Sequence, residues 1–177
     1  EEPIFLQQFV DQARKGRFGN TIVIIRFHPS DSHRTEKYEN QYSSDEELIR
    51  FDWADNNFAA EHRGTIVGPG SITSFVELMQ YSDVIINLGS TVTLDAIVHD
   101  TPVICPNIQF RKPVHFWDNI DLRYRNNHTE IVAASGAVGF PHTMEELCEE
   151  VGNALSNPSE KRSQRKKLEE KLIPTLP

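Results

Sequence analysis

The stretch 82-SDVIINLGSTVTLDAIVHDTPVICP-106 decides the predicted fold of this chain. Its first part, Asp83–Leu88, is an apolar run rich in Val and Ile, which is typical of a strand buried on both faces of a parallel sheet. A turn of small residues, Gly89–Thr91, precedes a helix-like segment at Val92–Val98, and a second apolar run follows at Val103–Cys105. The order strand, turn, helix, strand predicts a βαβ unit.

The turn Gly89–Thr91 is a candidate anion site. A helix that begins there leaves backbone N–H groups free and carries a partial positive charge at its N-terminus. The hydroxyls of Ser90 and Thr91 add further donors, so the pattern predicts binding of a phosphate or diphosphate. An ordinary helix cap explains the same residues equally well, because Ser and Thr are preferred capping residues.

Length and charge restrict the class of protein. A chain of 177 residues with 38% hydrophobic and 25% charged residues fits one globular domain, which we predict over residues 1–177. The net charge of −8 argues against nucleic-acid binding. No run approaches the roughly 20 apolar residues of a membrane span, and Glu1-Glu2 does not resemble a signal peptide. Cys105 and Cys148 lie in apolar patterns, which indicates a reducing, cytoplasmic compartment. We expect the chain to be the C-terminal part of a longer protein.

Alternating strand and helix patterns predict an α/β fold, a Rossmann-like three-layer sandwich with a mostly parallel central sheet. The further predicted strands are Thr21–Phe27, Leu48–Phe51, Gly64–Gly68 and Ala137–Phe140. The further predicted helices are Pro3–Ala13, a helix capped by Ser71, His128–Ser135, a helix opened by the capping box Thr143–Glu146, and Glu160–Ile173.

Ligands of such sheets bind beyond the carboxyl ends of the strands. Four loops follow predicted strands and should therefore line one cleft: His28-Pro29, Gly68-Pro69-Gly70, Gly89–Thr91 and Asn107. His28 would donate to a phosphate oxygen, and Arg26 lies two residues before it. Asp95, one helical turn beyond Thr91, would accept hydrogen bonds from ribose hydroxyls. A structural histidine and a solvated aspartate are the alternatives for His28 and Asp95.

Several other site types are excluded. No His or Cys spacing suits a metal, and neither a P-loop nor the dinucleotide fingerprint G-x-G-x-x-G is present, so we expect no metal and no cofactor. A basic cluster near the C-terminus suits a solvated helix better than a peripheral contact with an acidic membrane face, because Glu169 and Glu170 interrupt it. The cluster comprises Lys161, Arg162, Arg165, Lys166 and Lys167.

The same motifs resemble the C-terminal nucleotide-binding domain of GT-B fold glycosyltransferases. The form resembled is that of CDP-glycerol glycerophosphotransferases and other surface-carbohydrate transferases, over residues 21–158. The matching residues are His28-Pro29, Ser82-Asp83, Gly89–Thr91, Asp95-Ala96 and Pro102–Ile104. Retaining GT-B enzymes often carry two glutamates separated by seven residues, whereas here those positions hold Asn87 and Asp95.

The resemblance implies roles for individual residues. Ser90 and Thr91 would hold the donor diphosphate, Asp95 would bind the ribose, and His28 would contact the diphosphate or assist the leaving group as a tentative catalytic residue. Arg26, Gly68, Gly70 and Gly89 complete the predicted substrate-binding set.

The implied function is donor binding in a transferase of surface polysaccharide biosynthesis. The donor would be a nucleotide-diphosphate sugar or a CDP-polyol, and a missing N-terminal domain would bind the acceptor. We expect the fragment alone to be inactive. A nucleotide-sugar 2-epimerase and a non-catalytic scaffold domain are the alternatives.

Overall fold

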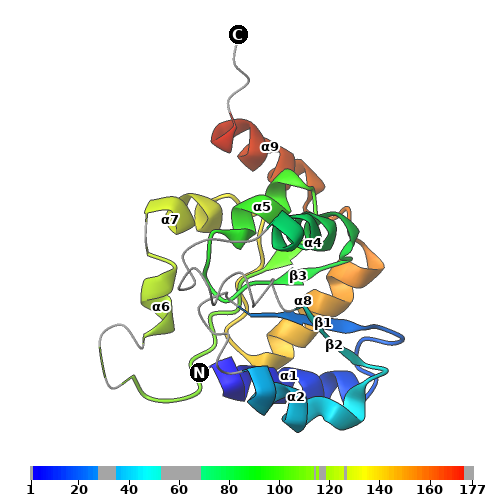
Figure 1. The fold of residues 1–177 in the computed structure, drawn as a ribbon. Helices are drawn as coiled ribbons and strands as arrows, with labels where there is room; N and C mark the ends of the chain where they lie inside the picture. The colour runs from blue at the N-terminus through cyan, green and yellow to red at the C-terminus, as the bar shows by residue number, and fades with distance from the viewer. Residues whose placement is uncertain are drawn as a thin grey trace. The chain divides into compact units, whose positions relative to one another are not determined.

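The computed structural model describes residues 2–27, 35–52, 69–113, 115, 119–125 and 127–173. The chain divides into two compact units. Unit 1 comprises Glu1–Phe18 and Met79–Pro177, and unit 2 comprises Gly19–Leu78. The prediction of one nucleotide-sugar-binding domain over residues 1–177 stays a prediction, and each unit is described by itself (Figure 1).

Unit 1 contains most of the helices that the structure describes. Its elements are α1 (Glu2–Arg14), β3 (Ile85–Ile86), α5 (Val92–Val98), β4 (Val103–Ile104), α6 (Ile120–Arg123), α7 (Asn127–Ala134), α8 (Met144–Ser156) and α9 (Arg162–Leu172). Unit 2 contains β1 (Val23–Arg26), α2 (Thr35–Tyr42), the 3₁₀ helix η2 (Ser43–Asp45), β2 (Ile49–Asp52) and most of α4 (Pro69–Tyr81).

The predicted βαβ unit is confirmed in unit 1. Strands β3 and β4 pair in parallel, with Ile85 opposite Val103 and Ile86 opposite Ile104, and α5 connects them. A third segment joins β4 through one parallel bridge between Ile104 and Gly139. Two backbone bonds of 2.8 Å extend this contact, from Cys105 N to the carbonyl of Gly139 and from Asn107 N to that of Pro141. The predicted strand Ala137–Phe140 is thus reduced to a bridge, because backbone bonding there begins only at Gly139.

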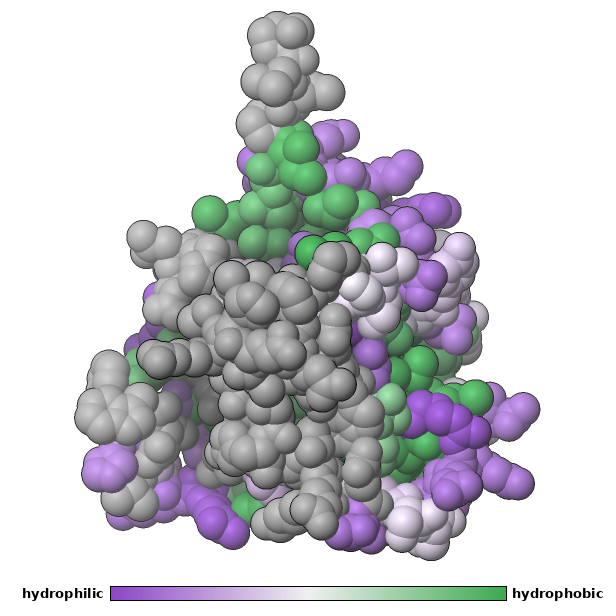
Figure 2. Space-filling model, viewed as in Figure 1, coloured by the Kyte–Doolittle hydropathy of each residue, from purple (hydrophilic) through white to green (hydrophobic). Residues whose placement is uncertain are grey.

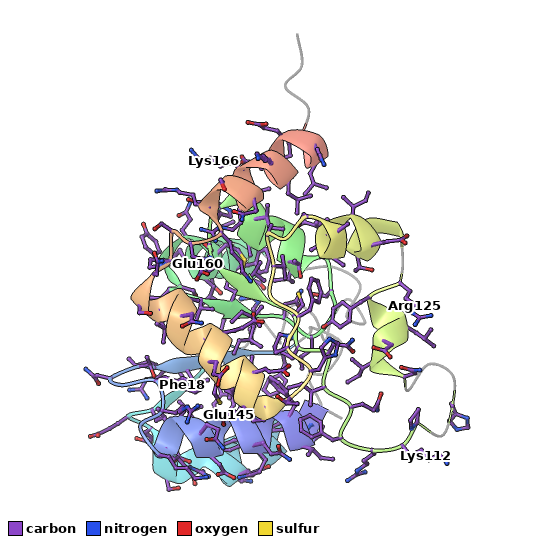
Figure 3. The ribbon with its side chains drawn as sticks, turned by 180° about the vertical axis from the view of Figure 1, so that it is seen from behind. Phe18, Lys112, Arg125, Glu145, Glu160 and Lys166 are labelled. Carbon is purple, nitrogen blue, oxygen red and sulfur yellow. The ribbon has the colours of Figure 1, made fainter. Side chains whose placement is uncertain are left out.

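Helices α1 and α8 belong to the core of unit 1. Phe5, Phe9 and Val10 of α1 are buried, as are Leu147 and Val151 of α8, as their helical spacing predicts. Figure 3 shows Phe18, beyond the end of α1, close to the start of α8. There Arg17 forms an ion pair with Glu145 of α8.

The capping box at the start of α8 is confirmed at Thr143. The Thr143 hydroxyl accepts a hydrogen bond of 3.1 Å from the backbone N–H of Glu146. The Glu146 carboxylate in turn accepts one of 2.7 Å from the N–H of His142, one residue before the position that the motif predicts.

Unit 2 is built on a second parallel pair, β1 and β2, in which Arg26 stands opposite Asp52. The Arg26 guanidinium forms an ion pair with Asp52 and donates to the Ser74 hydroxyl at 2.8 Å and the Ser71 hydroxyl at 2.7 Å. The prediction that Ser71 caps α4 was wrong, because the helix already begins at Pro69. The Ser71 hydroxyl serves the long-range contact with Arg26 instead.

These observations confirm a mixed α/β fold with short parallel sheets. The two strand pairs form separate two-stranded sheets in the part of the chain that the structure describes. The three-layer sandwich around one central sheet therefore stays a prediction. The predicted strand Gly64–Gly68 lies outside the described residues.

Glu150 of α8 gives a prediction about stability and pH. Its carboxylate lies next to Gly139, where a Cβ atom added to the glycine would collide with the Oε2 atom of Glu150. Partial burial raises the pKa of this carboxyl group, and the positive charge of Lys161 opposes the rise. Wild-type stability should fall as the pH rises through this raised pKa. Glu150→Gln is therefore expected to stabilise the chain at pH 7, by less than about 1 kcal/mol, and to have no effect in acid below the ordinary carboxyl pKa. Urea unfolding at both pH values measures this, and equal effects at both would contradict it.

Candidate functional site

The turn between β3 and α5 places small polar residues at the carboxyl end of β3. Gly89 has a φ of +83°, which a side chain disfavours, so glycine suits this position. Thr91 is the N-cap residue of α5 in a helical conformation, with φ −63° and ψ −13°, and its side chain makes no capping bond. The helix-cap explanation is therefore not supported for Thr91, which is an exposed residue. It holds in part for Ser90, whose hydroxyl accepts a hydrogen bond of 3.4 Å from the N–H of Val92.

Asn87 holds this turn in place. The residue is only 9% exposed. The amide nitrogen donates to the carbonyl of Ser90 and to the hydroxyl of Thr93, both at 2.7 Å, and the amide oxygen accepts from the Ser90 hydroxyl at 2.9 Å. A buried amide satisfied in this way fixes the position of the turn before any ligand arrives.

Thr93 and Cys105 continue the network into the core. The Thr93 oxygen lies 3.2 Å from the Cys105 sulfur. Burial raises the pKa of the Cys105 thiol to about 11, with the hydrogen bond to Thr93 opposing the rise. Cys105 is therefore a protonated thiol at neutral pH, which suits a packing role rather than a nucleophile.

A small pocket adjoins the turn, entirely within unit 1. The volume within it that is open to a water molecule is about 10 Å³, which holds about one water. Its lining combines small polar residues with apolar and aromatic ones. It is lined by Gly89, Ser90, Thr91, Thr93, Leu94, Cys105, Tyr124, Thr129, Val132 and Phe140.

The aromatic side of the pocket is fixed by its own contacts. Tyr124 and Phe140 meet edge to face, with ring centroids 5.3 Å apart. The Tyr124 hydroxyl donates to the carbonyl of Pro106 at 2.9 Å, which ties α6 to the end of β4. The pocket thus joins the ends of two neighbouring parallel strands.

The predicted site residues fall into three groups. Gly89, Ser90 and Thr91 come together at the pocket. Asp95 lies on α5 and does not line the pocket. Although the residue is largely exposed, partial desolvation of its carboxyl group raises its pKa, and the charge of His99 opposes the rise. The remaining predicted residues are Arg26, His28, Gly68 and Gly70.

Arg26 and Gly70 belong to unit 2. Four of the hydrogen bonds of the Arg26 guanidinium go to Asp52, Ser71 and Ser74 of the same unit. His28 and Gly68 lie outside the described residues. Whether the four predicted loops share one cleft therefore stays a prediction; Gly89–Thr91 and Asn107 do follow adjacent parallel strands.

The sequence reasoning missed Asn87, Tyr124 and Phe140 as members of the site. Asn87 carried a signal, because an amide that ends an apolar strand must find partners when it is buried. Tyr124 and Phe140 carried none, since they come from segments far from the turn in sequence.

Comparison with protein-family models, curated proteins and solved structures found no match. Among the described residues, no group of His, Cys, Asp and Glu side chains is arranged to hold a metal ion. No described helix has the length and apolar character needed to cross a membrane.

Proposed function

We propose that unit 1 binds the diphosphate of a nucleotide-linked donor at the Gly89–Thr91 turn. The observation that carries this proposal is the pocket lined by Gly89, Ser90 and Thr91, in a turn that Asn87 holds through its bonds to Ser90. The hydroxyl of the exposed Thr91, in a turn that follows a parallel strand, suits a phosphate as a hydrogen-bond donor. Because the pocket interior holds about one water, a phosphate would lie across its mouth.

The proposed reaction is transfer of a sugar or polyol phosphate from this donor to an acceptor. It is supported by the resemblance of the His28, Gly89–Thr91 and Asp95 motifs to transferases of the GT-B fold, including the CDP-glycerol glycerophosphotransferases. In this proposal unit 1 belongs to a Rossmann-like three-layer sandwich, and a further domain supplies the acceptor site. The protein would position the donor and stabilise the charge that develops on the leaving diphosphate, at the cytoplasmic side of a membrane.

A thermal-shift titration with CDP, UDP, GDP and CMP tests this proposal. One diphosphate should raise the unfolding temperature, and a ligand at about 100 times its dissociation constant stabilises by about 2.7 kcal/mol. Ser90→Ala should remove most of the shift, because Ser90 lies at the pocket. His28→Ala should weaken it as well.

Ser156→Ala is the matched control, because its hydroxyl bonds within the exposed end of α8. A shift that survives Ser90→Ala, or that Ser156→Ala abolishes equally, would contradict the proposed site. No shift with any nucleotide, with the fold intact, would favour the scaffold alternative. Conversion of a UDP-sugar without an acceptor would instead favour the epimerase alternative.

A further inference from the structure

Helix α9 combines a basic surface with exposed apolar side chains. It carries five basic residues and two acidic ones in a chain whose net charge is −8. Arg162 and Arg165 form ion pairs with Asp100 and hold the helix to the loop after α5. Two of the five basic residues of α9 are thus held in ion pairs, and its three lysines remain.

The three lysines of α9 point to solvent. Lys166, Lys167 and Lys171 are exposed, and the ion pairs among the described residues involve none of them. Figure 3 shows Lys166 on the outer side of the helix. Of the two acidic residues of α9, Glu169 is half-buried and Glu170 is exposed.

Exposed apolar side chains occur at the end of α9 and on α5. Ile173, directly after α9, is 55% exposed, and Val98 of α5 is 38% exposed. Figure 2 shows apolar residues gathered over the end of α9, with hydrophilic residues on their flank. The helices α5 and α9 contact one another, which Figure 1 also shows.

We propose that the C-terminal part of α9, with Lys166, Lys167, Lys171 and Ile173, docks on a membrane surface of anionic lipids. Charge complementarity selects this partner: the lysines face lipid phosphates, while the remainder of the chain is strongly acidic and is repelled by them. The apolar residue selects lipid over a soluble polyanion, because an acyl boundary accepts an isoleucine side chain and a polyanion does not. From the sequence alone, a solvated helix was the preferred interpretation of this basic cluster. The exposed side chain of Ile173 now favours contact with a membrane surface.

Co-sedimentation with vesicles tests the proposal on the full chain. Vesicles of phosphatidylcholine with phosphatidylglycerol should bind the chain, and vesicles of phosphatidylcholine alone should not. Each lysine near an anionic surface strengthens partitioning about fivefold, so the triple variant K166E/K167E/K171E should weaken it by at least about a hundredfold. Ile173→Ser should weaken it about fivefold. Binding should also decrease as salt is added.

The matched control is the triple variant K15E/R111E/K112E, which reverses the same number of exposed charges elsewhere in unit 1. It should bind within about threefold of wild type, since those residues do not belong to the surface. Circular dichroism verifies that each variant is folded. Equal loss in both triple variants, equal binding to neutral vesicles, or binding to soluble heparin but not to vesicles would each overturn the proposal. This test does not depend on the donor site.

Discussion

Asp100→Ala is expected to lower the free energy of unfolding of unit 1 by about 3 kcal/mol. Asp100 follows α5 and accepts from the Arg165 Nε atom at 2.9 Å and from the Arg162 Nε atom at 2.6 Å. The Arg165 side chain is only 3% exposed. Without Asp100, its charge would stay buried, with the carbonyl of Pro158 as its remaining partner among the described residues. Removing one partner of a buried ion pair is costly for this reason.

The backbone of Asp100 adds to the expected loss. Its φ is +56°, in the left-handed region that Asp and Asn tolerate better than Ala does. Asp100→Asn keeps this tolerance and one hydrogen-bond acceptor, so it should cost less than Asp100→Ala. The difference between the two variants separates the loss of charge from the loss of the acceptor and from backbone strain.

Two variants of the partners sharpen the test. Arg162 is 61% exposed, so Arg162→Ala should cost less than about 1 kcal/mol. Arg165→Met fills the same space without a charge and should cost about 1 kcal/mol, because Asp100 keeps Arg162 and is partly solvated. Urea unfolding measures all four variants. A loss below about 1 kcal/mol for Asp100→Ala would show that packing of Leu168, not the ion pair, holds α9 in place.

Local sequence patterns predicted the elements of unit 1 well where one element carries its own signal. The apolar runs of β3 and β4 and the cap at Thr143 follow from neighbouring residues alone. The prediction was wrong where a partner distant in sequence determines what a side chain binds. Ser71 reads as a cap, but its hydroxyl binds Arg26, 45 residues away.

The candidate site also combines features that neighbouring residues determine with features that only the fold creates. The turn Gly89–Thr91 was predicted because strand, turn and helix are contiguous. Tyr124 and Phe140, by contrast, come together at the pocket only through the fold. Asn87 lay within the motif, yet only its three hydrogen bonds reveal that it holds the turn.

Asn87→Ala is expected to weaken diphosphate binding at least about tenfold and to lower stability by about 2 kcal/mol. The variant removes the donor to the Ser90 carbonyl and the Thr93 hydroxyl and the acceptor of the Ser90 hydroxyl. A turn without these bonds must be ordered by the ligand itself, which reduces the affinity. Calorimetric titration with the diphosphate that stabilises wild type measures the change.

Thr101→Val supplies the matched control for stability. The Thr101 side chain is buried at the opposite end of α5, and its hydroxyl donates to the backbone carbonyl of Met79. Its loss should cost about 1 kcal/mol and leave the diphosphate affinity unchanged. If Thr101→Val weakens binding as much as Asn87→Ala does, the effect of Asn87 is a general loss of stability and not a loss of order in the turn.

Asn87→Asp separates hydrogen bonding from charge at the same position. An aspartate still accepts from the Ser90 hydroxyl but cannot donate to the Ser90 carbonyl, and it adds a negative charge beside the proposed phosphate. We therefore expect it to weaken binding further than Asn87→Ala, on the order of a hundredfold relative to wild type. Tighter binding by Asn87→Asp would contradict a phosphate at this turn.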